Sequence, residues 1–138
     1  MHIAQGLSLL RLAQLHDQHA VNQLTAACSL RFSPDQKHMF CSNAGDETVS
    51  MYKRDEKTGL LEQMCCLPIS GEYPKDIAIF PDDRHLASIN HESDSIPFFK
   101  IDYEKRTLIM KGRPISVDTP NCILIYKLSG EEEHKTQA

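Results

Sequence analysis

From residue 29 onward, apolar and polar residues alternate in short runs that are separated by turn-forming residues. Leu30 and Phe32 alternate with Ser29 and Arg31, a pattern typical of a strand with one buried face. Pro, Asp, Asn and Gly gather between the runs, where a chain can reverse its direction. The pattern predicts strands at residues 29–32, 38–42, 49–53, 61–67, 76–80, 85–90, 95–101 and 108–113.

These runs belong to a sequence repeat. Residues 32–43 reappear as residues 79–90, so that Asn43 returns as Asn90, 47 residues further on. The spacing then shortens to 46 residues, since the sequence Pro-Ile-Ser at 68–70 returns at 114–116. A repeat of about 40–50 residues with four short strands in each copy is typical of a β-propeller blade. We therefore predict an all-β fold.

The repeat divides the chain into segments. Residues 26–72 and 73–118 are predicted to be two four-stranded antiparallel blades, and residues 119–128 the first strand of a third blade, which would close a ring. Residues 1–25 lie outside the repeat and are predicted to contain a helix between residues 6 and 24, whereas residues 129–138 read as a charged tail. Pro97 falls inside a predicted strand, where its missing N–H must face a gap or a bulge.

Closed propellers have about 4–8 blades, and two blades cannot close a ring. The sequence therefore predicts either part of a larger protein or a protomer that self-associates through the open edges of its blades.

Composition and charge argue against nucleic acid and membranes as binding partners. The net charge of −4 leaves no basic surface for nucleic acid. No apolar run approaches the roughly 18 residues that a membrane span needs, and the N-terminal segment lacks the features of a secretory signal. The five cysteines are odd in number and contain no C-x-x-C pair, which favours reduced thiols in a cytoplasmic protein over disulfides or a zinc site.

Candidate chemistry lies on one rim of the predicted blades. Because strands alternate in direction, the loops after each second strand and between successive blades emerge on the same rim. This rim would carry Asn43, Asn90, Lys75 and the neighbouring pair His91 and Glu92. His91, Glu92 and Lys75 form the cluster with general acid–base potential. Two alternatives stay open: the repeated Asn43 and Asn90 read first as loop-shaping residues, and His91 reads equally well as an exposed histidine without a role.

Several segments together resemble the lactonase-type seven-bladed propellers, the family of bacterial 6-phosphogluconolactonase and fungal muconate-lactonizing enzymes. The resemblance rests on residues 33–43, 48–52 and 56–61 in the first unit, 73–79 and 90–96 in the second, and 120–123 as the family's closing strand. It covers residues 26–128. The resemblance implies cytoplasmic hydrolysis of a sugar-acid lactone, with no metal or organic cofactor.

Four positions differ from what many family members carry. Ser29 stands where an acidic residue is common, and Ala44 where an arginine is common. Lys75 replaces a common arginine, and His91 replaces a common glutamine. Lys75 keeps a positive charge but lacks the planar, two-pronged grip of arginine on an anion.

The leading hypothesis is a fragment of a lactonase-like propeller whose complete protein hydrolyses a small-molecule lactone. In it, Lys75 would bind the anionic end of the substrate, and His91 would polarise water or the lactone with Glu92 nearby. Asn43 and Asn90 would contribute to the substrate site. The first alternative is a non-catalytic propeller module that offers its rim or its open edges to a protein partner. The second is a truncated product without a function of its own.

Overall fold

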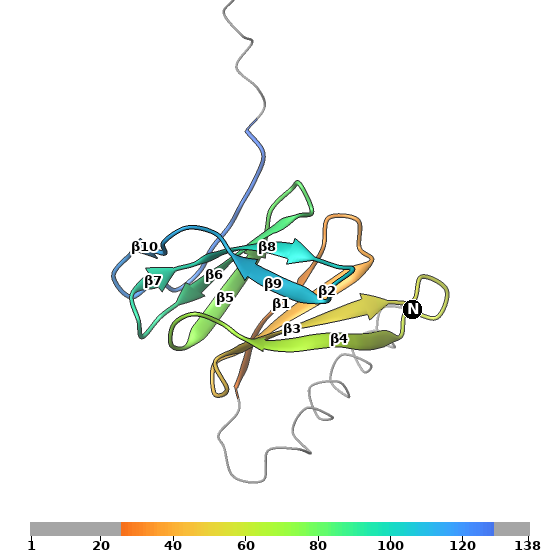
Figure 1. Cartoon of the computed structure of the whole chain (residues 1–138), viewed down its shortest axis with the longest axis horizontal. Coiled ribbons are helices and arrows are strands. Elements are labelled where there is room, and N and C mark those ends of the chain that lie inside the picture. Colours follow the sequence, from red (N-terminus) through yellow and green to blue (C-terminus); the bar gives the residue numbers. More distant parts are fainter. Residues whose placement is uncertain (1–25, 129–138) are drawn as a thin grey trace, which may run out of the picture.

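The first repeat unit folds into one antiparallel sheet. The computed structural model describes residues 26–128, in which two sheets lie side by side (Figure 1). The first sheet has the order β1-β2-β3-β4, with β1 (Ala27–Phe32), β2 (His38–Asn43), β3 (Thr48–Arg54) and β4 (Leu61–Pro68). This up-and-down order confirms the predicted first blade. The predicted N-terminal helix and the charged tail lie outside the described residues.

The second unit also forms an antiparallel sheet. It has six strands, because two of the four strands expected for a blade are each divided in two. These are β5 (Pro74–Ile79), β6 (His85–Asn90), β7 (Ser95–Ile96), β8 (Phe98–Asp102), β9 (Thr107–Met110) and β10 (Ile115–Ser116). β5 pairs with one edge of β6, and β7 and β8 pair with the other. β8 then pairs with β9, and β7 with β10. The predicted second blade is therefore confirmed, with its third and fourth strands each divided in two.

Pro97 explains the interruption of the third strand. It separates β7 from β8 and accepts a hydrogen bond from the Ser88 N–H at 3.2 Å, but it has no N–H to donate back to β6. In the fourth strand, the Lys111 N–H donates to the Phe98 carbonyl at 2.7 Å, and residues 112–114, which include Gly112 and Pro114, lie outside the strands. The fourth strand, predicted over 108–113, therefore ends at Met110 and resumes at Ile115. The expected gap at Pro97 is confirmed.

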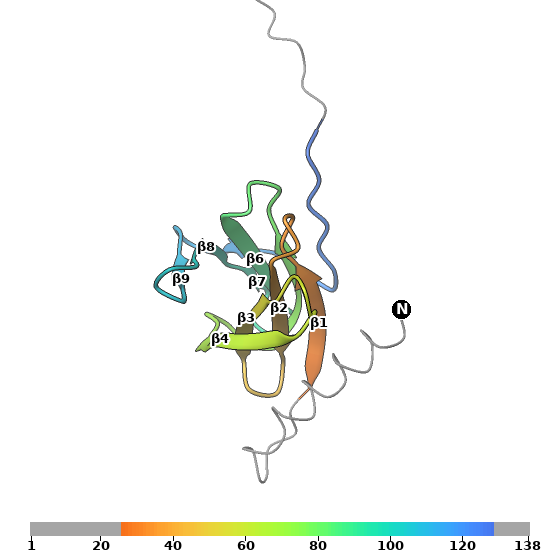
Figure 2. The same cartoon turned by 90° about the vertical axis from the view of Figure 1, so that its right-hand side faces the viewer.

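The predicted strand at residues 119–128 is not observed as a strand. The segment starts against the second blade, where the Thr119 N–H donates to Asp94 Oδ1 at 2.8 Å, and then runs outward from the two sheets (Figure 2). The first strand of a blade is held by the ladder that it forms with the second strand. Among residues 26–128 no strand lies in that position, so the segment stays unpaired.

The two blades share an apolar core. Cross-strand neighbours such as Phe40 and Met51 point the same way and are fully buried. The core cluster contains Phe40, Val49, Met51, Ile69, Ile77, Leu86, Phe99 and Ile101. The first strands of the two blades, β1 and β5, lie in close contact, whereas the outer strands β4 and β9 touch little. Neighbouring blades around a common axis have this wedge-shaped arrangement.

One further contact joins the blades at the rim that carries the Pro-Asp turns. The imidazole of His38 stacks on the ring of Tyr103 with centroids 4.1 Å apart, and the Tyr103 hydroxyl donates to Asp83 Oδ1 at 2.9 Å. Burial lowers the pKa of His38, which favours the neutral ring. His38 therefore acts as a packing residue of the seam between the blades.

The repeat extends to the backbone conformation of the turns. Equivalent positions of the two units take positive φ angles in pairs: Gln36 (60°) and Asp83 (56°), Glu47 (55°) and Asp94 (49°), Gly59 (72°) and Arg106 (53°), and Tyr73 (57°) and Thr119 (39°). Left-handed backbone costs a residue with a side chain about 1–2 kcal/mol, whereas glycine adopts it freely. The two units therefore use the same turn geometry even where their residues differ.

Gly59 and Arg106 provide a matched pair for a stability test. A Cβ at Gly59 would meet no atom within 4 Å, so Gly59→Ala is expected to cost only the backbone term, about 1 kcal/mol. Arg106→Gly is expected to gain about 0.5 kcal/mol, because relief of strain exceeds the added flexibility of the unfolded chain. Urea unfolding of both variants measures these changes, and a loss of stability in Arg106→Gly would contradict the account.

Candidate functional site

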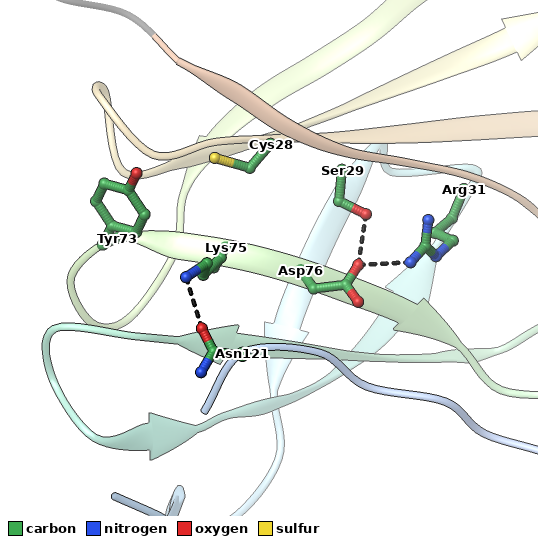
Figure 3. A pocket seen from close by; sticks show the side chains of 7 residues that line it. All are labelled: Cys28, Ser29, Arg31, Tyr73, Lys75, Asp76 and Asn121. Atoms are coloured by element: carbon green, nitrogen blue, oxygen red, sulfur yellow. Dashed lines mark hydrogen bonds and ion pairs between the residues drawn. The ribbon is translucent and has the colours of Figure 1, made fainter. Parts of the chain in front are cut away.

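A pocket opens between the first strands of the two blades. Its volume is about 360 Å³, and it lies between β1, β5 and the segment that begins at Pro120 (Figure 3). The lining residues are Cys28, Ser29, Arg31, Tyr73, Lys75, Asp76 and Asn121. This volume falls within the range of small-molecule sites, about 300–1,000 Å³.

The pocket is built from one position of the repeat. Cys28, Lys75 and Asn121 stand 47 and 46 residues apart, so they are the same position in three successive units. Lys75 Nζ donates a hydrogen bond to Asn121 Oδ1 at 2.6 Å, which joins the second unit to the third. In a propeller, equivalent residues of successive first strands line the central axis. The pocket therefore faces the axis of the blades.

Asp76 is the most heavily bonded side chain of the pocket. Its Oδ1 accepts hydrogen bonds from Ser29 Oγ at 2.6 Å, Arg31 Nη2 at 2.7 Å and the Ile77 N–H at 2.9 Å. Its Oδ2 accepts from the Ile123 N–H at 3.1 Å. A buried carboxylate needs such partners, because burial removes the water that would otherwise solvate it. Asp76 thereby links both blades to the segment that follows them.

Lys75 is the one predicted site residue that lines this pocket. It lies on β5, is half-buried, and points toward Asn121 (Figure 3). The pocket lining carries two cations, Lys75 and Arg31, and one carboxylate, Asp76. Its formal charge therefore suits an anionic ligand.

His91 lies next to this pocket, outside its lining residues. Its Nδ1 is 3.1 Å from the carbonyl oxygen of Pro120, and its ring centroid is 6.1 Å from that of Tyr73. A carbonyl oxygen can only accept, so this contact selects the neutral tautomer with the proton on Nδ1 and the lone pair on Nε2. Because Lys75 contacts Asn121 and His91 contacts Pro120, the structure brings both predicted residues to one segment.

The other three predicted residues lie apart from the pocket lining. Glu92 is exposed. The buried amide of Asn43 accepts hydrogen bonds from the Ala26 and Gly45 N–H groups and donates one to Asp46 Oδ2. Asn90 is fully buried, donates to the Ser70 carbonyl and accepts from Ser88 Oγ. These contacts support the loop-shaping interpretation of both asparagines, while a role in substrate binding stays a prediction.

Sequence reasoning did not select Arg31, Asp76, Tyr73 or Asn121 as site residues. The repeat contained a usable signal, because the spacing of 47 residues that relates Cys28 to Lys75 also relates Ser29 to Asp76. Among residues 26–128 no three His, Cys, Asp or Glu side chains cluster as metal ligands. In the same residues no helix is long and apolar enough to cross a bilayer.

Known proteins match the chain over most of its length. A 6-phosphogluconolactonase of Photorhabdus laumondii is 33% identical over 86 residues, which cover 60% of this chain and 26% of the relative. The crystal structure of a putative 6-phosphogluconolactonase from Bacteroides fragilis superimposes with a TM-score of 0.65 at 26% identity, covering 70% of this chain and 27% of that protein. The periplasmic gluconolactonase PpgL of Pseudomonas aeruginosa has the same fold, with a TM-score of 0.69 at 21% identity over 75% of this chain and 29% of that one.

The matched region is a fraction of each relative. The chain spans about a quarter of the length of the first curated relative and slightly more of the solved proteins. The sequence model of the family described as "Lactonase, 7-bladed beta-propeller" matches residues 4–125. With its repeat, its two blades and this match, the chain belongs to the seven-bladed β-propeller lactonase family.

Proposed function

We propose that this chain supplies part of the wall of a lactone-hydrolase pocket, and that the substrate is a sugar-acid lactone of the 6-phosphogluconolactone type. The observation that carries the proposal is Lys75, which occupies the axial position of the repeat inside a pocket with a net positive lining. Membership of the lactonase family supports it, as do relatives named for this activity. A cytoplasmic location remains a prediction.

The proposed chemistry uses protein side chains and water. Lys75 binds the anionic end of the lactone, because an ammonium donates strong, charge-assisted hydrogen bonds to oxyanions. His91 Nε2 takes a proton from water as the water oxygen attacks the lactone carbonyl. The ring C–O bond then breaks, and the proton passes to the leaving alkoxide. Glu92 follows His91 on the same loop, and Asn43 and Asn90 hold the rim loops in shape.

Substitution of the two central residues separates their proposed roles. Lys75→Ala is expected to raise KM for 6-phosphogluconolactone about 10- to 100-fold with a smaller change in kcat, because it removes a contact present throughout the reaction. His91→Ala is expected to lower kcat by about 100-fold, the effect of losing a general base. The measurement is the rate of hydrolysis above the spontaneous rate.

Two variants on the opposite rim control for non-specific effects. Lys57 lies in the turn between β3 and β4, and His85 begins β6 directly after the turn that follows β5. Lys57→Ala and His85→Ala are expected to leave the kinetics unchanged. The assignment is wrong if Lys75→Ala and His91→Ala both hydrolyse the lactone as fast as the unmodified chain.

A second candidate function is a non-catalytic module that binds another protein chain or a second copy. The observation in its favour is the unpaired segment after the second blade, where Leu124, Tyr126 and Leu128 are 81%, 70% and 74% exposed. Exposed apolar strands with unpaired backbone groups recruit other strands. The molar mass in solution decides between the candidates: an active monomer supports the enzyme, whereas an inactive oligomer supports the binding module.

A further inference from the structure

Arg31 departs from the repeat pattern at a position that faces the pocket. Its equivalents in the next two units are Ala78 and Leu124, which are apolar. A charge is therefore not needed to form this strand. Because this unit has an arginine at the position, a guanidinium lies between the blades, beside the buried Asp76 (Figure 3).

The Arg31 guanidinium is held in place, but not all of its N–H donors have a hydrogen-bond partner in the described residues. Arg31 Nη2 donates to Asp76 Oδ1 at 2.7 Å, and Nη1 donates to the Leu30 carbonyl at 3.1 Å. A guanidinium has five N–H donors, so three remain after these two contacts within the described part of the chain. The side chain is 45% exposed, whereas that of Asp76 is 9% exposed. The remaining donors are therefore more exposed than the carboxylate that anchors them.

The Asp76 carboxylate that holds Arg31 is itself fixed through both of its oxygens. Ser29 and Ile77 bind the same Asp76 oxygen as Arg31, and Ile123 binds the other oxygen. With both of its oxygens occupied, Asp76 is fixed and orients Arg31. Holding a binding group in its final geometry lowers the entropy cost of association.

We propose that Arg31 and Lys75 together form a two-cation site for an oxyanion, a carboxylate or a phosphate of a sugar-derived ligand. Arg31 is the residue that sets the preference for an anionic over a neutral ligand, since its planar fork matches two oxygens of one oxyanion. Asp76 is a positioning residue that acts through Arg31. This inference rests on the proposed function and deepens it by naming the group that recognises the charge.

Three probes of similar size test the preference: glucose is neutral, gluconate carries a carboxylate and glucose 6-phosphate carries a phosphate. Isothermal titration calorimetry on the unmodified chain is expected to show at least tenfold tighter binding of one or both anions than of glucose. The anion that binds tighter identifies the group that the site recognises. Arg31→Ala is expected to reduce this preference about tenfold or more. Arg31→Lys is expected to give an intermediate loss, because the charge remains without the fork.

Asp76→Asn tests positioning against simple electrostatics. Removal of a negative charge from the pocket would strengthen anion binding if charge alone mattered. We expect weaker anion binding instead, because Arg31 loses the ion pair that holds it in place. Arg84→Ala, on an exposed turn between β5 and β6, is the matched control and is expected to change nothing. Thermal unfolding of each variant establishes that it is folded, and Arg31→Gln, which keeps a long polar side chain, replaces Arg31→Ala if the latter does not fold.

Two results would overturn the inference: equal affinity of the unmodified chain for all three probes, or an anion preference that survives in Arg31→Ala. Failure of the two-cation site can be distinguished from failure of the proposed hydrolase function. Unchanged anion binding in Arg31→Ala beside Lys75-dependent hydrolysis rejects only the role of Arg31. Arg31-dependent binding without any hydrolysis rejects only the enzyme.

Discussion

Asp76→Ala is expected to lower the free energy of unfolding of this chain by about 3 kcal/mol. The substitution removes the acceptor for Ser29 Oγ, for Arg31 Nη2 and for the Ile123 N–H. Water can reach Arg31, which is 45% exposed, but within the described residues the buried Ser29 hydroxyl loses its acceptor. An unsatisfied buried donor and the loss of the hydrogen-bond network around a buried carboxylate are among the few changes that cost this much.

Urea unfolding at neutral pH measures the effect. Asp76→Asn is expected to lose less, about 1.5 kcal/mol, because an amide oxygen can still accept one or two of these hydrogen bonds. Glu104→Ala, on the exposed turn between β8 and β9, is the control and is expected to stay within about 0.5 kcal/mol of the unmodified chain. Equal stabilities of Asp76→Ala and Glu104→Ala would show that Asp76 does not join the two blades.

Gly71→Ala is expected to destabilise the chain by a similar amount, about 3 kcal/mol. Gly71 has a φ of 122°, which disfavours any residue with a side chain. A Cβ there would also lie 2.7 Å from Ser93 Oγ and would collide with the amide of Asn90. Asn90 cannot move away easily, since it is fully buried and its amide is bonded to Ser70 and Ser88.

Gly59→Ala separates the two causes. Both glycines have positive φ, but only Gly71 faces close neighbours, so the difference between the two variants measures the cost of the collision. The expected difference is about 2 kcal/mol in urea unfolding. Equal losses in the two variants would mean that the rim loop accommodates a methyl group, and that Asn90 does not fix its shape.

The fold could be predicted from the sequence because the same pattern of strands and turns occurs in both copies of the repeat. Alternating patterns are ambiguous one at a time, but the same order of strands and turns in two copies points to one architecture. The exceptions have local causes. Pro97 divides the third strand of the second blade, because it has no N–H to donate to β6. The segment at 119–128 has the composition of a first strand but no second strand beside it in the described residues.

The site could be predicted only in part. Lys75 was found because rim loops and ionisable side chains can be read from a sequence. Arg31 and Asp76 lie within strands, where alternation predicts burial or exposure but not which neighbouring blade a side chain meets. Their 2.7 Å contact joins residues 45 positions apart, and only the packing of β1 against β5 brings them together. His91 shows the converse, since its sequence position suggested a site while its ring lies beside the pocket lining.

The central claim is that equivalent positions of successive repeats converge on one ligand pocket. Amide chemical-shift mapping of the ¹⁵N-labelled chain with 6-phosphogluconate, the stable product of the proposed reaction, tests it directly. The account predicts that the shifted resonances cluster at residues 28–31, 73–76 and 121–123. Shifts confined to the turns at residues 33–37 and 80–84, on the opposite rim, would contradict it, as would a titration without any shift.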